Sequence, residues 1–166
     1  MTALREKGIE ISLPSGVRGR KFDDASHGLS HCMKAVDFII ELNDRILFVE
    51  IKDPEHSGVA KESREDFVRR FQVGEIDRDL ARKYRDTFLY EWAAERLGKP
   101  VHYLVLVAIS ALDAAMLLAR TDALKRELPF DGPSSGTWTR RFADGCMVFN
   151  LAAWNEYMTE FRVRRS

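Results

Sequence analysis

Two apolar segments separated by a tight turn constrain this fold more than any other feature of the sequence. Residues 35–42 and 45–52 are both rich in Val, Ile, Leu and Phe, and Asn43-Asp44 between them is a turn signal. We predict that the two segments form an antiparallel β-hairpin. The hairpin is expected to end before Pro54, because proline cannot donate a hydrogen bond to a strand ladder.

The turn also predicts the register of this hairpin. Counting back from a two-residue turn at Asn43-Asp44 places Asp37 opposite Glu50. Because side chains alternate along a strand, Lys52 emerges on the same face, two residues beyond Glu50. The other face is apolar and is expected to enter the core; it carries Val36, Phe38, Ile40, Leu42, Leu47, Val49 and Ile51.

This arrangement carries the residue types that phosphodiester hydrolysis needs. Directly opposed residues have Cβ atoms about 5 Å apart, so Asp37 and Glu50 repel each other unless a cation compensates their charges. Mg²⁺ prefers carboxylate oxygens and keeps waters for a substrate. The Lys52 ammonium can reach a metal-bound water or a scissile phosphate, where a cation stabilises developing charge. The alternative is a solvent-facing hairpin on which Lys52 simply pairs with a nearby carboxylate.

The spacing of these residues resembles a known signature. Asp37, a gap of twelve residues and then Glu50-Ile51-Lys52 are similar to the PD-(D/E)xK motif of restriction-endonuclease-like nucleases. The resemblance covers about residues 8–110 and includes the hairpin, the helix after it and a later apolar strand. It implies that Asp37, Glu50 and the main-chain carbonyl of Ile51 hold Mg²⁺ or Mn²⁺. It also implies that Lys52 positions the attacking water.

The sequence departs from the family pattern at two points. Val36 stands where the signature has proline, which is a common variation. The family often adds an acidic residue from a helix before the hairpin, and no amphipathic helix precedes the hairpin here. Glu10, Asp23 and Asp24 are the candidates for this third acid. We prefer Asp24, because residues 17–34 lead directly into the hairpin.

The rest of the chain alternates between helix and strand patterns. Helices are expected at 60–72, 78–97 and 111–127, strands at 8–13, 101–109 and 146–151, and loops at 17–34 and 130–137. The strand at 101–109 is almost wholly apolar, as expected of a strand buried on both faces. We therefore predict one α/β domain over residues 1–166, with a restriction-endonuclease-like central mixed β-sheet flanked by α-helices.

Basic residues crowd the start of the helix expected at 78–97. A phosphate there would reconcile them with the positive end of the helix dipole, and the family resemblance implies a substrate-side basic residue on this helix. The alternative is local pairing with Asp79 and Asp86 at helical spacing. The candidate phosphate ligands are Arg82, Lys83 and Arg85.

Aromatic residues give two further signals. The helix expected at 78–97 repeats aromatic residues at i, i+4 spacing, namely Tyr84, Phe88 and Trp92. We expect them in the core rather than as a stacking platform for bases. Trp138 and Trp154 lie near Arg140 and Arg141, a combination found in nucleic-acid-binding proteins, and the alternative is packing beneath a charged surface.

Composition sets the remaining limits. The 26 basic and 26 acidic residues balance, and the sequence pI is near 6.9, so nucleic acid would have to be bound by local patches, a homodimer or a partner subunit. Two cysteines give no disulfide framework, which favours a cytoplasmic location. No apolar run approaches the roughly 20 residues of a membrane span, and we expect no membrane contact.

From the sequence we expect a divalent-metal-dependent nuclease, with DNA favoured over RNA on the family resemblance alone. Two alternatives stay open: a non-catalytic interaction subunit with a nuclease-like fold, and a metal-dependent hydrolase of a small phosphorylated substrate. The intact triad of Asp37, Glu50 and Lys52 favours catalysis. The neutral pI favours the interaction subunit.

Overall fold

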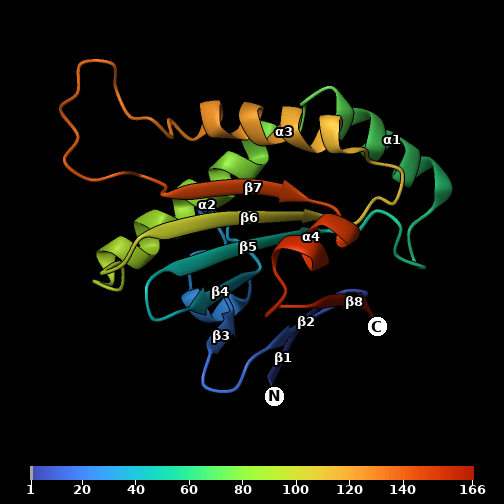
Figure 1. Cartoon of the computed structure of the whole chain (residues 1–166), viewed down its shortest axis with the longest axis horizontal. Helices are drawn as coiled ribbons and strands as arrows, with labels where there is room; N and C mark the ends of the chain where they lie inside the picture. Colours follow the sequence, from blue (N-terminus) through green and yellow to red (C-terminus); the bar gives the residue numbers. More distant parts are fainter. Residues whose placement is uncertain (1) are drawn as a thin grey trace.

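The computed structural model describes residues 2–166 and consists of two β-sheets with helices around them (Figure 1). The larger sheet has the strand order β3-β4-β5-β6-β7, and the smaller has the order β1-β2-β8. The strands are β1 (Thr2–Glu6), β2 (Ile9–Leu13), β3 (Arg18–Lys21), β4 (Phe38–Glu41), β5 (Ile46–Lys52), β6 (Val101–Val107), β7 (Gly145–Phe149) and β8 (Val163–Arg165). The helices are α1 (Lys61–Gln72), α2 (Asp77–Ala93), α3 (Ala114–Glu127) and α4 (Leu151–Tyr157), with a short 3₁₀-helix η1 (Ala25–His27).

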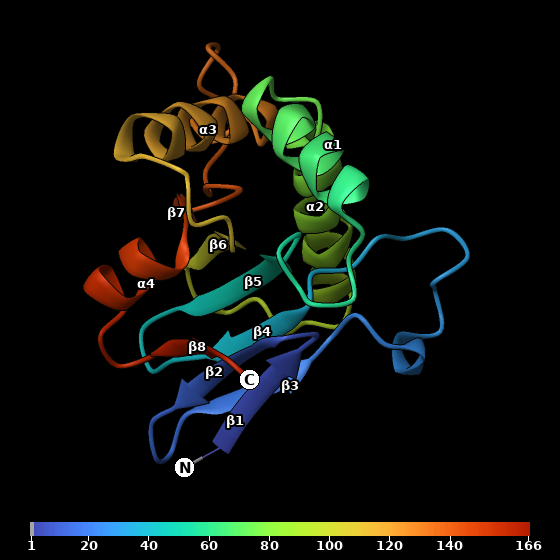
Figure 2. The ribbon, with the colours of Figure 1, turned by 90° about the vertical axis from the view of Figure 1, so that its right-hand side faces the viewer.

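The larger sheet is mixed, as predicted. Strands β3, β4 and β5 are antiparallel to one another, whereas β5, β6 and β7 run parallel. Helices α1, α2 and α3 lie on one face of this sheet, and the smaller sheet and α4 lie on the other (Figure 2). Side chains that alternate along β4, β5 and β6 therefore enter two separate hydrophobic cores. The predicted α/β class with a mixed sheet flanked by helices is confirmed.

Strands β4 and β5 pair in the predicted register. Ile39 lies opposite Phe48, and the Leu42 amide donates a 2.9 Å hydrogen bond to the Arg45 carbonyl across the turn. The two-residue turn thus sets the pairing of the whole hairpin, because one fixed pair determines every other pair along the strands.

One residue of the expected apolar face lies on the other side of the sheet. The prediction for Val36 is wrong, because β4 begins only at Phe38 and strand alternation does not extend back to Val36. Val36 packs in the core beneath the helices, and its amide donates to the Thr87 hydroxyl of α2 at 3.1 Å. The segment before β4 is thereby tied to helix α2.

The unpredicted elements are short, and most of them are polar. Strand β3 lies in the segment expected to be a loop, and β8 is the basic end of the chain. Edge strands are often short and charged, which keeps their free edges from pairing with other chains, and such strands show little hydrophobic alternation. Helix α4 and strand β1 were not predicted either.

The expected aromatic stripe of α2 is only partly in the core. Tyr84 is fully buried, but Trp92 is 60% exposed, so its predicted core position is wrong. Trp154 is fully buried against the smaller sheet, and its indole N–H donates to the Phe161 carbonyl at 2.6 Å. Of the two tryptophans singled out near basic residues, only Trp138 is therefore at the surface, where it is 50% exposed.

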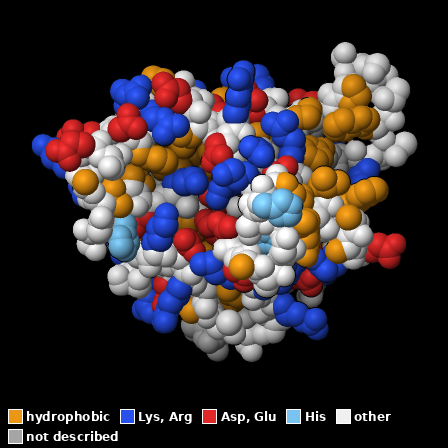
Figure 3. Space-filling model, turned by 180° about the vertical axis from the view of Figure 1, so that it is seen from behind, with side chains coloured by type: hydrophobic (Ala, Val, Ile, Leu, Met, Phe, Trp, Pro, Cys, Tyr) orange, Lys and Arg blue, Asp and Glu red, His pale blue; other side chains and the backbone are white. Residues whose placement is uncertain are grey.

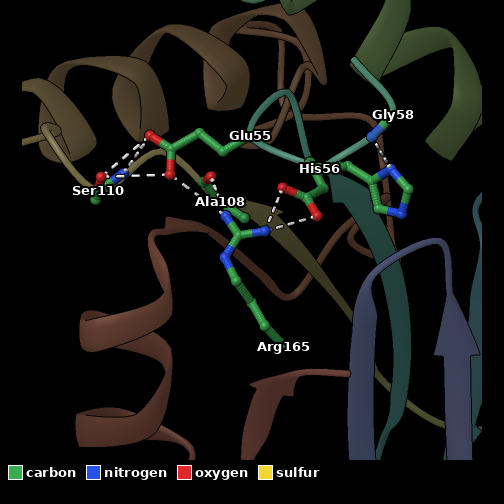
Figure 4. Close-up of polar contacts among 7 residues, drawn as sticks. Glu55, His56, Gly58, Ala108, Ser110 and Arg165 are labelled. Carbon is green, nitrogen blue, oxygen red and sulfur yellow. Dashed lines mark hydrogen bonds and ion pairs between the residues drawn. The ribbon is translucent and has the colours of Figure 1, made fainter.

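The penultimate residue of the chain holds the end of β5 in place (Figure 4). Arg165 Nη1 lies 2.8 Å from both carboxylate oxygens of Asp53, which directly follows β5. Arg165 Nη2 donates to the Ala108 carbonyl at 3.0 Å, at the end of β6, and lies 3.4 Å from Glu55 Oε2. Glu55 in turn accepts hydrogen bonds from the hydroxyl and the amide of Ser110. These contacts fix the ends of two central strands.

We expect Arg165→Ala to lower the free energy of unfolding by about 2 kcal/mol, because it leaves the buried Asp53 carboxylate without its cation. Urea denaturation at neutral pH measures the change. Arg162→Ala is the control, since Arg162 is exposed and forms no ion pair within residues 2–166. Equal unfolding curves for the two variants would show that the contacts of Arg165 do not stabilise the protein.

Candidate functional site

Three elements bring charged side chains together beneath helix α2. The β4–β5 pairing ends at Phe38 and Val49; Asp37 directly precedes β4, and its carboxylate lies against β5, where it accepts a hydrogen bond from the Ile51 amide. Both carboxylates are buried, with Asp37 4% and Glu50 1% exposed. Lys52 follows on the same face of β5, and Lys83 reaches the pair from α2. The structure therefore brings Asp37, Glu50 and Lys52 together and adds a second lysine.

Glu50 is the centre of this cluster. Its Oε1 atom lies 2.8 Å from the Nζ atoms of both Lys52 and Lys83. Its Oε2 atom is buried and has no hydrogen-bond partner within residues 2–166. An unpaired buried oxygen costs free energy, and such atoms are rare in folded proteins. Glu50 Oε2 is thus the atom of the cluster with free capacity to bind a ligand.

The main chain of Ile51 lies beside Asp37. Asp37 Oδ2 accepts a 2.6 Å hydrogen bond from the Ile51 amide. The amide and the carbonyl of one strand residue point toward the same neighbouring strand. The adjacent Lys52 carbonyl accepts from Ala108 on the opposite side, so the Ile51 carbonyl faces the side of Asp37. This is the carbonyl that the family resemblance assigns to metal binding.

The burial of two neighbouring carboxylates shifts their titration. Removal from water, and next the charge of Glu50, raise the pKa of Asp37 from 3.8 to about 7. Burial opposes the charged form of Lys83, but attraction to Glu50 and a hydrogen bond with it outweigh burial and raise the pKa of Lys83. At neutral pH Lys83 is therefore an ammonium group, while the Asp37 carboxyl is close to its titration midpoint.

Two charged residues near the cluster were not found from the sequence. Lys21 Nζ in β3 lies 2.7 Å from Glu6 Oε2 in β1, and the charges of both residues act on Asp37. Asp23, which was a candidate from the sequence, also lies near the cluster, with its Oδ2 atom 3.9 Å from Lys83 Nζ. Glu6 and Lys21 belong to strands that the sequence pattern did not predict, so no signal in the sequence linked them to the hairpin.

The three candidates for an additional acid lie in different places. Asp24 is exposed, and its Oδ1 accepts from the Ser26 amide at 2.9 Å, which caps η1. Glu10 is held by Arg5 and Arg164 in the smaller sheet. Within residues 2–166 Asp24 makes no hydrogen bond or ion pair with the cluster, and Asp23 is the candidate that approaches it.

The three basic residues of α2 also separate. Lys83 joins the cluster through Glu50. Arg82 Nε lies 3.5 Å from Asp86 Oδ2, at the helical spacing of the local-pairing alternative. Arg85 is exposed, and its Nε donates to the Ala81 carbonyl at 3.4 Å. Arg82 and Arg85 therefore lie on the outer surface of the helix.

The cluster offers part of a divalent-metal site. The two carboxylates, the unpaired Glu50 Oε2 and the Ile51 carbonyl are hard oxygen ligands of the kind that Mg²⁺ and Mn²⁺ prefer. Within residues 2–166, no group of three or more His, Cys, Asp or Glu side chains is arranged to hold a metal ion. Water or phosphate oxygens would have to complete the coordination shell, which is usual for Mg²⁺.

The comparisons with known proteins assign no family. No family model matches the sequence, and no curated protein or solved structure matches the chain. In the described part of the chain, no helix is both long and apolar enough to cross a membrane. The function is therefore inferred from the residues of the site and their geometry.

We expect the stability of the metal-free protein to fall as the pH rises from about 4 to about 7. In this range Asp37 keeps its proton in the folded protein but has released it in the unfolded chain. Each unit by which the pH rises therefore lowers the free energy of unfolding. The loss is at most about 4 kcal/mol, because the pKa difference is about 3 units. Asp37→Asn keeps an acceptor for the Ile51 amide and removes the titration.

Urea denaturation in EDTA across this pH range makes the comparison. We expect the wild-type curve to fall relative to that of Asp37→Asn, and the variant to be the more stable protein at pH 8. Parallel curves for the two proteins would show that burial does not raise the pKa of Asp37 in the folded protein.

Proposed function

We propose that this protein is a divalent-metal-dependent nuclease with a restriction-endonuclease-like fold, acting on DNA. One observation carries the proposal: the buried Asp37 carboxylate lies against β5 at the Ile51 amide, next to the buried Glu50, and the Lys52 ammonium lies 2.8 Å from Glu50. Two acids and a lysine in this order on one hairpin match the PD-(D/E)xK signature. The helix and the parallel strand that follow the hairpin agree with the common core of that family.

The residues of the cluster would have different roles in hydrolysis. Asp37, Glu50 and the Ile51 carbonyl would hold Mg²⁺ or Mn²⁺, which when bound polarises a phosphate and lowers the pKa of a bound water. Asp37 has to release its proton to become a ligand, and its pKa of about 7 allows this at neutral pH. Lys52 becomes free to orient a water or to contact a phosphate once Glu50 binds another cation.

Lys83 has a supporting role in this scheme. Its ammonium contacts the same Glu50 oxygen as Lys52 but comes from the facing helix. At 2.8 Å it lies close enough to attract the Glu50 carboxylate and to hold it against β5. A second cation beside the phosphate would also stabilise negative charge during bond cleavage.

A non-catalytic interaction subunit is the second candidate. It is favoured by the two lysines, which balance the charge of Glu50 without any metal ion. A buried network of this kind can also serve only to fix the packing of a helix against a sheet. The two candidates differ in whether a divalent ion displaces the lysines.

We expect Glu50→Gln and Lys52→Met each to lower cutting of DNA by roughly a hundredfold or more, because each removes a group that acts on the reacting phosphate or its water. Gel assays with plasmid and with single-stranded DNA in Mn²⁺ measure the rate. Lys61→Met is the matched control, since Lys61 is 79% exposed and pairs only loosely with Glu65. Circular dichroism verifies that each variant is folded.

Undiminished cutting by the two site variants would overturn the assignment. Absence of cutting by the wild-type protein, with Mn²⁺ binding also absent, would favour the interaction subunit. Hydrolysis of nucleotides or model phosphate esters without cutting of polymers would point to a small phosphorylated substrate.

A further inference from the structure

An exposed aromatic surface lies at the C-terminal part of helix α2, the helix that carries Lys83. A shallow pocket of about 250 Å³ is lined by Phe88, Trp92, Trp138, Arg140, Arg141 and Phe142, and we call it the aromatic shelf. Trp92 is 60% and Trp138 is 50% exposed. Two large aromatic side chains left half in water on one patch indicate an interaction surface, because burying such rings is strongly favourable.

The floor of the aromatic shelf is fixed to the core. The Phe142 ring lies 4.8 Å from that of Phe88 and 5.1 Å from that of Tyr84. The buried Tyr84 hydroxyl donates a 2.6 Å hydrogen bond to the Phe142 carbonyl. Trp138 contacts the same Phe142 ring edge-on at 6.5 Å. Trp138 thus packs on a ring that is itself held by the core.

The chemistry of the aromatic shelf fits a single strand of nucleic acid. Two of its six lining residues are arginines and none is acidic. The Arg140 guanidinium already lies over the Phe88 ring, 5.7 Å from its centre. Flat aromatic faces next to cations are what unpaired bases and their phosphates require: bases stack on the rings, and arginines contact the backbone. A duplex keeps its bases stacked inside and cannot use the rings in this way.

Helix α2 connects the aromatic shelf to the candidate site. Trp92 and Lys83 are about 14 Å apart along the helix axis and on opposite flanks of it. Successive residues turn by about 100°, so Arg82 lies on the outer surface between these two flanks, and Arg85 lies on the same flank as Trp92. In Figure 3, which shows the side of the molecule behind the sheet, Lys and Arg side chains lie at the centre of the face with Asp and Glu side chains among them, and hydrophobic side chains gather beside them. The Lys and Arg side chains would guide a phosphate backbone across the helix.

We propose that the aromatic shelf binds an unpaired nucleic-acid strand and leads it across α2 to the Asp37–Glu50 cluster. Bases stack on Trp92 and Trp138, while Arg140 and Arg141 contact phosphates. Delivery to the cluster rests on the proposed nuclease function, whereas binding of the strand does not. The substrate class is accordingly a single strand or an unpaired end rather than an intact duplex.

Binding is measured in EDTA, where no cutting can interfere, by fluorescence anisotropy of a labelled oligonucleotide of about 20 nucleotides, long enough to span one site. We expect single-stranded DNA to bind more tightly than the matched blunt duplex. The double variant Trp92→Ala/Trp138→Ala should weaken single-strand binding by roughly tenfold or more. Trp92→Phe/Trp138→Phe should largely restore it, because a ring is kept. Tyr157→Ala, which removes another exposed ring outside the shelf, should change nothing.

Changing both arginines tests the contact with phosphate. Arg140→Gln/Arg141→Gln should reduce the dependence of binding on salt between about 50 and 200 mM, because fewer counterions are released from the strand. Wild-type affinity in the double tryptophan variant would overturn the proposal, and so would preferred binding of the duplex. Sedimentation that shows a dimer lost in the tryptophan variant, with no oligonucleotide bound, would assign the shelf to self-association instead.

Cutting assays separate this inference from the proposed function. If the shelf binds single strands but the wild-type protein cuts nothing in Mn²⁺, the proposed nuclease function is wrong and the proposed role of the shelf in binding is retained. If the protein cuts single-stranded DNA and the tryptophan variant keeps its KM, the proposed role of the shelf in binding is wrong and the nuclease function is retained. If both hold, the tryptophan variant should show a raised KM with kcat little changed, since the shelf contributes binding and not chemistry.

Discussion

The arrangement of the site depends on the ion pairs that Glu50 forms with two lysines. An ionised carboxylate that is removed from water costs several kcal/mol unless it is paired. Glu50 is 1% exposed, and the sheet that carries it is covered on both faces. The compensating charges therefore have to come from neighbouring elements, and they come from β5 itself and from helix α2. Helix and strand are coupled through one oxygen atom.

Asp37 is less well compensated than Glu50. It receives the Ile51 amide, but burial and the neighbouring carboxylate still move its pKa to about 7. A purely structural network would be expected to satisfy each of its members, whereas this one leaves Glu50 Oε2 unpaired and Asp37 poised to titrate. Perturbed carboxyls with a specific charge partner are more frequent at functional sites than in ordinary cores. A divalent cation would relieve both defects together.

The parts of the site that follow from local rules could be predicted from the sequence. The turn at Asn43-Asp44 and the alternation along two strands were enough to predict the β4–β5 register and to bring Asp37 and Glu50 into one cluster. Strand β6 was evident because an almost wholly apolar run of its length is typical of a strand buried on both faces. Both inferences needed only neighbours along the chain or across one turn.

The parts that depend on long-range packing could not be predicted in the same way. The contact of Lys83 with Glu50 depends on how α2 lies across the sheet, which no pattern within the helix specifies. Glu6 and Lys21 approach Asp37 only because two polar strands, β1 and β3, lie next to each other. Trp92 has helical spacing typical of a core residue, yet it lies on a flank of α2 that faces away from the core, so it is exposed while the preceding Glu91 is buried.

Crystals soaked with Mn²⁺ at about pH 8, where Asp37 is ionised, test the central claim most directly. Anomalous scattering locates the metal independently of any assay of activity. We expect a peak between Asp37 and Glu50, with at least one lysine ammonium moved away from Glu50 Oε1. A map with no metal at this position, and with Lys52 and Lys83 still bound to Glu50, would contradict it.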